Sequence, residues 1–270
     1  MQHLESYKRD GYVLLRNAVD PRSVEAIKED AKALFRKMFR KNWLDEHSGE
    51  QGFADALYQL FTVSYADFLG AARAAQHLIS MHRFVVSEQI SDLLHGLGLA
   101  MPIVCVKPII YFNSRHLAKN EGHYKTPPHQ DWRSMQGSLN SVVIWVPLVD
   151  IDVGLGAIEF IPGSHLTGLR LTEKDEWYRR IPESIAPASS FVPVEVRAGD
   201  LVAFSAFAVH RSGDNVTQAI RWSIHVRFND AAEPNFVNRG MPHPYSVYQP
   251  SQELVTQNFP SLDQLHTTFT

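Results

Sequence analysis

From residue 103 onward the sequence is divided into short runs of β-branched and aromatic residues, separated by Pro, Gly and Asn. Short runs at this spacing are typical of a β sandwich or a rolled barrel, because each run ends where the chain has to turn. The predicted strands are Val104–Phe112, Val142–Leu148, Ala157–Ile161, Val192–Val196, Leu201–Phe204 and Arg221–Phe228. The second half of the chain is therefore expected to be mainly β structure.

The part of the chain before residue 100 has a helical pattern instead. Asp20 and Pro21 mark a helix start, because an acidic cap followed by proline suits the first turn. Apolar residues then recur at steps of three and four, which places them on one face of a helix: Val24, Ile27, Ala31, Leu34 and Met38. Less regular helical segments are expected from about Gly52 to Leu99, and a short strand at Tyr12–Arg16.

Length and composition set the class of protein. A chain of 270 residues with 44% hydrophobic side chains can bury one large core, so we expect a single domain over 1–270. Within it, helical support is expected at about 20–99, a β core at about 103–230 and a C-terminal extension at 231–270.

The charge balance and the cysteine count exclude several kinds of partner and site. A formal charge of −3 gives no basic field for nucleic acid or a membrane surface. The single Cys105 excludes an internal disulfide and a thiolate cluster within one chain. The N-terminal residues are too charged for a signal peptide, and no apolar run is long enough to span a membrane. A cytoplasmic protein is expected, and its oligomeric state stays open.

A histidine and a carboxylate lie two residues apart at His129 and Asp131. In an extended backbone alternate side chains point to the same face, so the two can bind one metal ion. His210 follows the predicted strand Leu201–Phe204 and can complete the site from across the fold. Chance pairs are common in a chain with 13 histidines, but two histidines and one carboxylate are the ligand set of non-heme Fe(II) oxygenases.

The last predicted strand alternates sharply between two faces. One face is apolar (Trp222, Ile224, Val226 and Phe228), and the other carries Arg221, Ser223, His225 and Arg227. A basic side chain inside a barrel is costly unless an anion meets it, and a guanidinium pairs well with a carboxylate. Arg221 therefore either receives a dicarboxylate, pairs with an acid of the protein, or lies on the outer face.

Five segments in this order resemble the phytanoyl-CoA dioxygenase family, whose members depend on iron and 2-oxoglutarate. The segments are His129–Asp131, Ile161–His165, Ala198–Leu201, His210–Asn215 and Arg221. The resemblance extends from about Tyr12 to Phe228. It implies a double-stranded β-helix, which is a jelly roll of two sheets, with helices buttressing one of them.

The resemblance also implies the ligands of the metal. His129, Asp131 and His210 match the three iron ligands of the family. Relatives that halogenate have a small residue in place of the carboxylate, so the presence of Asp131 favours oxygenation.

Three further residues match positions that surround the family's cosubstrate. Arg221 matches the arginine that holds the distal carboxylate of 2-oxoglutarate, and Ser212 matches the neighbouring hydroxyl donor. Trp145 stands where the family often has a tryptophan close to the cosubstrate.

The expected cofactors are therefore Fe(II), 2-oxoglutarate and O2. The expected reaction is hydroxylation of an unactivated C–H bond of a small-molecule metabolite, with release of succinate and CO2. Desaturation, ring closure and epimerisation remain open as outcomes, and the same ligands also accept nickel, cobalt or zinc. The alternatives are a catalytically silent jelly roll that binds a metal or metabolite, and a zinc cupin-like isomerase or hydrolase.

Other notable residues have more ordinary interpretations. His165 is expected to be a hydrogen-bonding turn residue rather than a fourth ligand. His225 either lines the pocket or is a satisfied barrel histidine. Gly154–Gly156 is expected to be a turn, and the long connection 165–191 either covers the site as a lid or is a solvated excursion.

Overall fold

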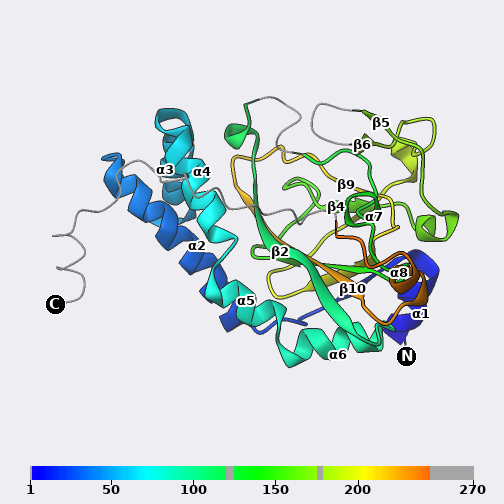
Figure 1. Cartoon of the computed structure of the whole chain (residues 1–270). Coiled ribbons are helices and arrows are strands. Elements are labelled where there is room, and N and C mark those ends of the chain that lie inside the picture. Colours follow the sequence, from blue (N-terminus) through cyan, green and yellow to red (C-terminus); the bar gives the residue numbers. More distant parts are fainter. Residues whose placement is uncertain (1, 120–124, 175–178, 244–270) are drawn as a thin grey trace, which may run out of the picture.

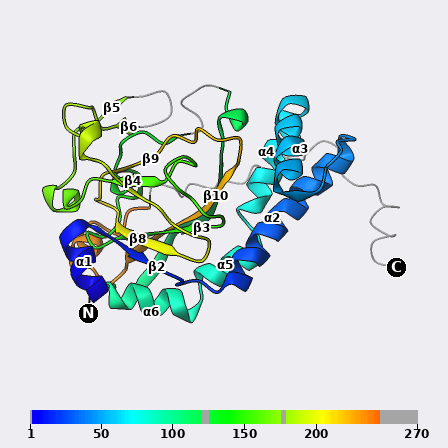
Figure 2. The same cartoon turned by 180° about the vertical axis from the view of Figure 1, so that it is seen from behind.

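Two antiparallel sheets form a sandwich, and helices cover one side of it (Figures 1 and 2). The structure is a computed structural model, and it describes residues 2–119, 125–174 and 179–243. The larger sheet has the order β1-β8-β3-β10-β2, with β1 Tyr12–Leu15, β8 Leu201–Ser205, β3 Val142–Pro147, β10 Arg221–Asp230 and β2 Pro102–Asn113. The smaller sheet has the order β7-β4-β9, with β7 Val192–Val194, β4 Ile158–Phe160 and β9 His210–Ser212. This arrangement confirms the expected jelly roll with N-terminal helices.

The helical layer is formed mostly by the first hundred residues. After the short α1 Gln2–Asp10 come α2 Pro21–Lys41, α3 Gly49–Val63, α4 Tyr65–Ala75, α5 Ile79–Val85 and α6 Glu88–Gly96. The helix start predicted at Asp20 is confirmed, since the Asp20 side chain accepts a hydrogen bond from the Arg22 amide at 2.9 Å. The predicted strand near Tyr12 and the helical segments after residue 49 are confirmed too.

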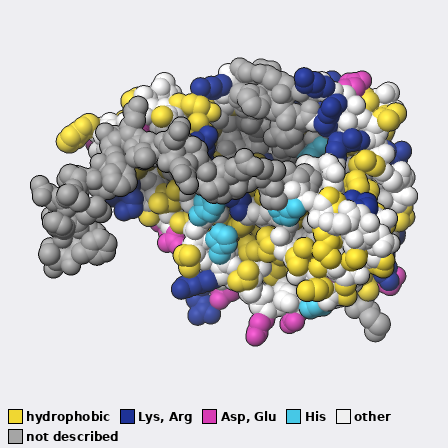
Figure 3. All heavy atoms as spheres, viewed as in Figure 1, with side chains coloured by type: hydrophobic (Ala, Val, Ile, Leu, Met, Phe, Trp, Pro, Cys, Tyr) yellow, Lys and Arg dark blue, Asp and Glu magenta, His cyan; other side chains and the backbone are white. Residues whose placement is uncertain are grey.

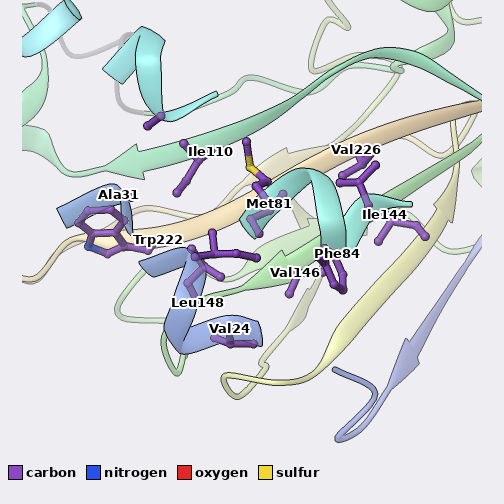
Figure 4. Close-up of a cluster of buried hydrophobic side chains, with 14 of the residues drawn as sticks. Val24, Ala31, Met81, Phe84, Ile110, Ile144, Val146, Leu148, Trp222 and Val226 are labelled. Atoms are coloured by element: carbon purple, nitrogen blue, oxygen red, sulfur yellow. The ribbon is translucent and has the colours of Figure 1, made fainter. Parts of the chain in front are cut away.

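The main core lies between these helices and the larger sheet. Figure 4 shows Val24 and Ala31 of α2, with Met81 and Phe84 of α5, facing Trp222 and other strand residues. The Trp222 ring lies 4.9 Å from Phe112 and 5.8 Å from Phe53, centroid to centroid. This packing uses the apolar face of β10, as the alternation of its sequence predicted.

A second core fills the space between the two sheets. Trp145 of β3 and Phe204 of β8 pack there against Ile158 and Phe160 of β4. Strand β10 lies between β3 and β2 and packs its apolar face against the helices, so its polar face looks into this space. The jelly roll thus brings charged side chains to the inside of its sandwich.

The connection 165–191 contains more structure than the sequence suggested. A two-stranded ribbon pairs β5 Glu173–Lys174 with β6 Arg179–Arg180, and the buried Ile181 follows it. In the C-terminal extension the short helix α8 Pro234–Asn238 is described, whereas residues 244–270 lie outside the described residues. None of the described helices is both long and apolar enough to cross a membrane.

The contribution of the main core can be measured at Trp222. Replacing this buried ring with alanine should lower the free energy of unfolding by about 3–5 kcal/mol, because it leaves a cavity between sheet and helices. Trp43, which is 93% exposed, is the matched control, and Trp43→Ala should change stability by less than about 0.5 kcal/mol. Urea unfolding measures both; equal effects would contradict this account of the core.

Candidate metal centre

His129, Asp131 and His210 meet at one end of the space between the sheets. His129 and His210 form an isolated antiparallel bridge, with amide-to-carbonyl distances of 3.0 and 3.1 Å. One ligand atom from each of the three side chains lies within 4.8 Å of the others. The fold therefore brings together the three residues that the sequence selected, although they come from separate segments.

The backbone at Asp131 differs from the extended conformation that we expected. Asp131 has φ −63° and ψ −30°, and the helical turn α7 Trp132–Met135 begins directly after it. Its carbonyl accepts a hydrogen bond from the Met135 amide at 3.1 Å, while the Trp132 amide donates to the Ala206 carbonyl. The turn competes with strand pairing, so only His129 is in a β-bridge, yet both side chains reach the same point.

The histidine rings are oriented by backbone carbonyls. Nδ1 of His129 lies 2.9 Å from the Pro127 carbonyl, and Nδ1 of His210 lies 3.1 Å from the Ala208 carbonyl. A proton on Nδ1 serves these hydrogen bonds and leaves the Nε2 lone pair to bind a metal. Nε2 of His129 lies 3.8 Å from Asp131 Oδ1, and Nε2 of His210 lies 3.8 Å from Asp131 Oδ2, so the three groups converge.

Burial keeps the histidines neutral, whereas the neighbouring Arg227 and histidines keep the carboxylate charged. Burial lowers the pKa of His129, and burial together with His129 lowers the pKa of His210 to about 3. Burial alone would raise the pKa of Asp131, but the Arg227 guanidinium and the nearby histidines outweigh it and hold this pKa below its usual range. Neutral imidazole and ionised carboxylate are the forms that bind metal.

The unsatisfied atoms of the cluster fit a cation. Asp131 Oδ2 and His210 Nε2 are buried and have no hydrogen-bond partner among the described residues. Leaving such acceptors unpaired is costly, so atoms of this kind usually have a ligand. Two imidazole nitrogens and one carboxylate oxygen suit Fe(II) and leave further coordination positions open.

Arg221 and Ser212 also come together, as expected. Arg221 Nη2 donates to Ser212 Oγ at 3.1 Å, and Nη1 donates to the Gly156 carbonyl. Gly156 has φ +86°, and a Cβ there would lie 2.8 Å from the Gly213 carbonyl oxygen, so the predicted turn requires glycine. This turn places a carbonyl against the guanidinium.

Arg221 is buried without an anion beside it. The side chain is 5% exposed, its Nε has no hydrogen-bond partner, and none of the ion pairs among the described residues includes it. Burial lowers its pKa to about 10, which still leaves it charged at neutral pH. Arg221 therefore does not lie on the outer face and has no acidic partner among the described residues, so an incoming anion fits.

The metal cluster and Arg221 line the same cavity of about 630 Å³, a size typical of small-molecule sites. Trp145 is buried and lines it as well, opposite His225 in the β3–β10 pairing. His225 proves to be a cavity residue. Neither ring nitrogen has a hydrogen-bond partner among the described residues, and burial lowers its pKa well below the usual value.

His165 lies elsewhere and serves the fold. Its Nε2 is 3.1 Å from the Lys8 carbonyl, and its ring packs against the backbone of Gly11. It is therefore a hydrogen-bonding residue of the turn Ser164–Thr167, as expected, and no ligand of the cluster.

One residue of the site was given no role by sequence reasoning. Arg227 Nε and Nη2 both donate to Asp131 Oδ1, at 3.1 and 2.9 Å. The alternation of β10 had placed Arg227 on the polar face, beside Arg221 and His225. Only the fold could show its partner, because Asp131 lies far away in the sequence.

The mouth of the cavity is rich in cations. Lys174 and Arg179 line it and are direct partners in the β5–β6 ribbon, whereas Arg180 is paired with Glu173. Figure 3 shows lysine and arginine side chains gathered over this region. The other described cations of the lining outside β10 are Lys125, Arg133 and Arg211.

A jelly roll that combines a His-x-Asp…His cluster with a buried arginine in one cavity defines a non-heme iron oxygenase. The family model for "Phytanoyl-CoA dioxygenase (PhyH)" matches residues 7–223. The chain belongs to this family of Fe(II)- and 2-oxoglutarate-dependent oxygenases, which confirms the resemblance and the expected cofactors.

Similar proteins differ in the reactions named for them. The chain is 24% identical to the 1-deoxypentalenic acid 11-beta-hydroxylase of Streptomyces exfoliatus, covering 93% of this chain and 88% of that one. It is 30% identical to the phytanoyl-CoA dioxygenase of Arabidopsis thaliana over 61% of this chain and 59% of that one. The solved epimerase SnoN, in complex with Fe3+, alpha ketoglutarate and nogalamycin RO, has a similar fold, with a TM-score of 0.61, 24% identity and 96% of each chain covered.

The neutral histidines predict how the stability of the metal-free protein depends on pH. Below pH 6.5 the unfolded chain protonates His210, but the folded state with a pKa of about 3 does not. The free energy of unfolding should therefore fall as the pH drops from about 6.5, by up to about 1.4 kcal/mol per pH unit for this one group.

Urea unfolding of the metal-free protein between pH 7.5 and pH 5 measures this dependence. His210→Gln should reduce the slope of the unfolding free energy against pH by the contribution of about one proton. His47→Gln, at an exposed position, should leave that slope as it is. A slope that His210→Gln does not alter would show that His210 is not held neutral.

Proposed function

We propose that the protein is a dioxygenase that hydroxylates an unactivated C–H bond of a small-molecule metabolite, using Fe(II), 2-oxoglutarate and O2 and releasing succinate and CO2. One observation carries this proposal: a converging ligand triad and an arginine without an anion line the same buried cavity. A metal-binding protein or a zinc isomerase has no need of the second feature.

In this proposal His129, Asp131 and His210 hold the iron. The iron supplies the activation of dioxygen, coupled to the oxidative decarboxylation of 2-oxoglutarate. The neutral histidines offer Nε2 because their Nδ1 atoms are engaged by backbone carbonyls. Fixing the ligands before the metal arrives removes part of the ordering cost of the reaction.

Arg221 and Ser212 would hold the distal carboxylate of 2-oxoglutarate. The guanidinium is already fixed by the Gly156 carbonyl, so its free Nε edge stays available to a carboxylate. A buried cation attracts an anion more strongly than an exposed one, because little water screens it. Trp145 is proposed to contact the cosubstrate from β3, in the wall of the same cavity.

The lining of the outer cavity supports a substrate with both apolar and anionic parts. Ile109, Phe112 and Leu117 provide apolar surface, while Lys174 and Arg179 stand directly opposite each other at the mouth. Like charges in opposite positions of a ribbon are unfavourable unless an anion lies near them. The ribbon is thus placed to cover a bound substrate, which is the lid role considered for 165–191.

Arg221→Met tests the cosubstrate site. The variant should still bind Fe(II), because Arg221 makes no contact with the triad, but its affinity for 2-oxoglutarate should fall about 100-fold or more, since a buried charge pair is lost. The measurement is the absorption band that 2-oxoglutarate induces in the anaerobic Fe(II) protein, followed by 2-oxoglutarate consumption in air. Arg180→Met, outside the cavity, is the control and should behave as the wild type.

Asp131→Ala tests the metal site separately. Removing the only charged ligand should weaken Fe(II) binding well beyond tenfold, and unchanged binding would exclude the proposed site.

Hydroxylation itself is identified when a substrate gains one oxygen atom from 18O2 for each succinate that is formed. Epimerisation or ring closure would consume 2-oxoglutarate without placing that atom in the product.

A further inference from the structure

We propose that Arg227 is a positioning residue that restricts Asp131 to binding the metal through a single oxygen, Oδ2. The inference rests on the proposed metal site but concerns a residue that is not one of the three ligands. Two donors of one guanidinium, Nε and Nη2, converge on the same carboxylate oxygen at 3.1 and 2.9 Å. Among the described residues the other oxygen, Oδ2, has no hydrogen-bond partner, and it lies 3.8 Å from His210 Nε2.

This contact gives the two oxygens of the Asp131 carboxylate different roles. An ordinary arginine–carboxylate fork engages both oxygens, one with each donor. Here both donors are used on Oδ1, which also lies 3.8 Å from His129 Nε2. Oδ2, at 3.8 Å from His210 Nε2, is therefore the carboxylate oxygen that Arg227 leaves for a metal. A metal bound to both oxygens would have to displace a charge-assisted hydrogen-bond pair in a buried place.

Arg227 also restricts the rotation of the Asp131 carboxylate about its side-chain bonds. The backbone of Asp131 is already fixed, because its carbonyl accepts from the Met135 amide at 3.1 Å and from Ser134 Oγ at 3.0 Å. The side chain can still turn about its own bonds. Arg227 and Asp131 are 7% and 2% exposed, so water competes little for this hydrogen bond.

Arg227 lies at a local irregularity of the large sheet. The pairing of β10 with β2 changes register on both sides of Arg227, while its pairing with β3 continues undisturbed. Between the pairs His225↔Ile109 and Phe228↔Val104, β2 uses five steps where β10 uses three. Such bulges bend the sheet and re-aim side chains next to active sites.

The functional consequence concerns the number of open coordination positions. With the metal bound to His129, Asp131 and His210, the cosubstrate and dioxygen would both need positions that the protein leaves open. A carboxylate that binds through both oxygens would occupy one of these. Through its contact with Asp131, Arg227 thereby keeps open the positions on which the proposed chemistry depends.

The first test is a crystal structure of the wild-type protein loaded with Co(II), which does not depend on the folding of any variant. Asp131 should bind cobalt through Oδ2 alone while Arg227 remains within hydrogen-bond distance of Oδ1. Two similar cobalt–oxygen distances, or a guanidinium turned away from Oδ1, would overturn the proposal.

The second test compares variants by the visible absorption of bound Co(II), without and then with 2-oxoglutarate. Arg227→Met should change the spectrum before any 2-oxoglutarate is added and should weaken 2-oxoglutarate binding by about tenfold or more. Arg227→Lys retains the charge but not the pair of N–H donors. Its spectrum and its affinity for 2-oxoglutarate should lie between those of Arg227→Met and the wild type. Thermal unfolding checks that each variant is folded.

Arg221→Met is the matched control, because it removes an equally buried arginine from the same strand. It should leave the spectrum of Co(II) alone unchanged and impair only the binding of 2-oxoglutarate. If the spectrum of folded Arg227→Met equals that of the wild type, Arg227 does not position the carboxylate. If the wild type binds neither Co(II) nor 2-oxoglutarate, the proposed function fails instead.

Discussion

The structure depends on the burial of two guanidinium groups on one strand, since charge inside a sandwich requires a partner of opposite sign. Arg227 has its partner in Asp131, at 2.9 Å. In the described part of the chain Arg221 has neutral partners only, a carbonyl and a hydroxyl. Removing a charged group from water costs several kcal/mol, and a well-placed counter-charge offsets this cost. Arg227 therefore stabilises the ionised form of Asp131, and Arg221 favours the binding of an anionic ligand.

Much of this arrangement follows from the sequence, because alternation along a strand is a local property. The apolar residues of β10 pack against the helices and its polar residues face the cavity, as the pattern predicted. The spacing of His129 and Asp131 led us to propose a shared metal, although Asp131 does not have the extended backbone that this argument assumed. The alternation of β10 singled out Arg221, and the resemblance to a family gave it a role. These inferences succeed where neighbouring residues, or a known motif, determine the geometry.

What the sequence did not reveal depends on contacts between distant segments. The pairing of Arg227 with Asp131 joins residues 96 positions apart, beside a register shift between β10 and β2 that no local pattern encodes. The helical turn at Asp131 is stabilised partly by the Ala206 carbonyl, from another part of the chain. Strand β9 has only three residues, two of them charged or hydroxylated, so its tendency to form a strand is weak without β4 beside it.

The double role of β10 has a consequence for how this protein can change over evolution. Every second side chain of the strand supports the helical layer, and those between them surround the chemistry, so an insertion or deletion there would exchange the two sets. The strand is thus expected to tolerate little variation in length. The β5–β6 ribbon at the cavity mouth is exposed and pairs with no other sheet, so it can diverge at small cost to the core. New substrates are best sought by altering the ribbon while β10 is left intact.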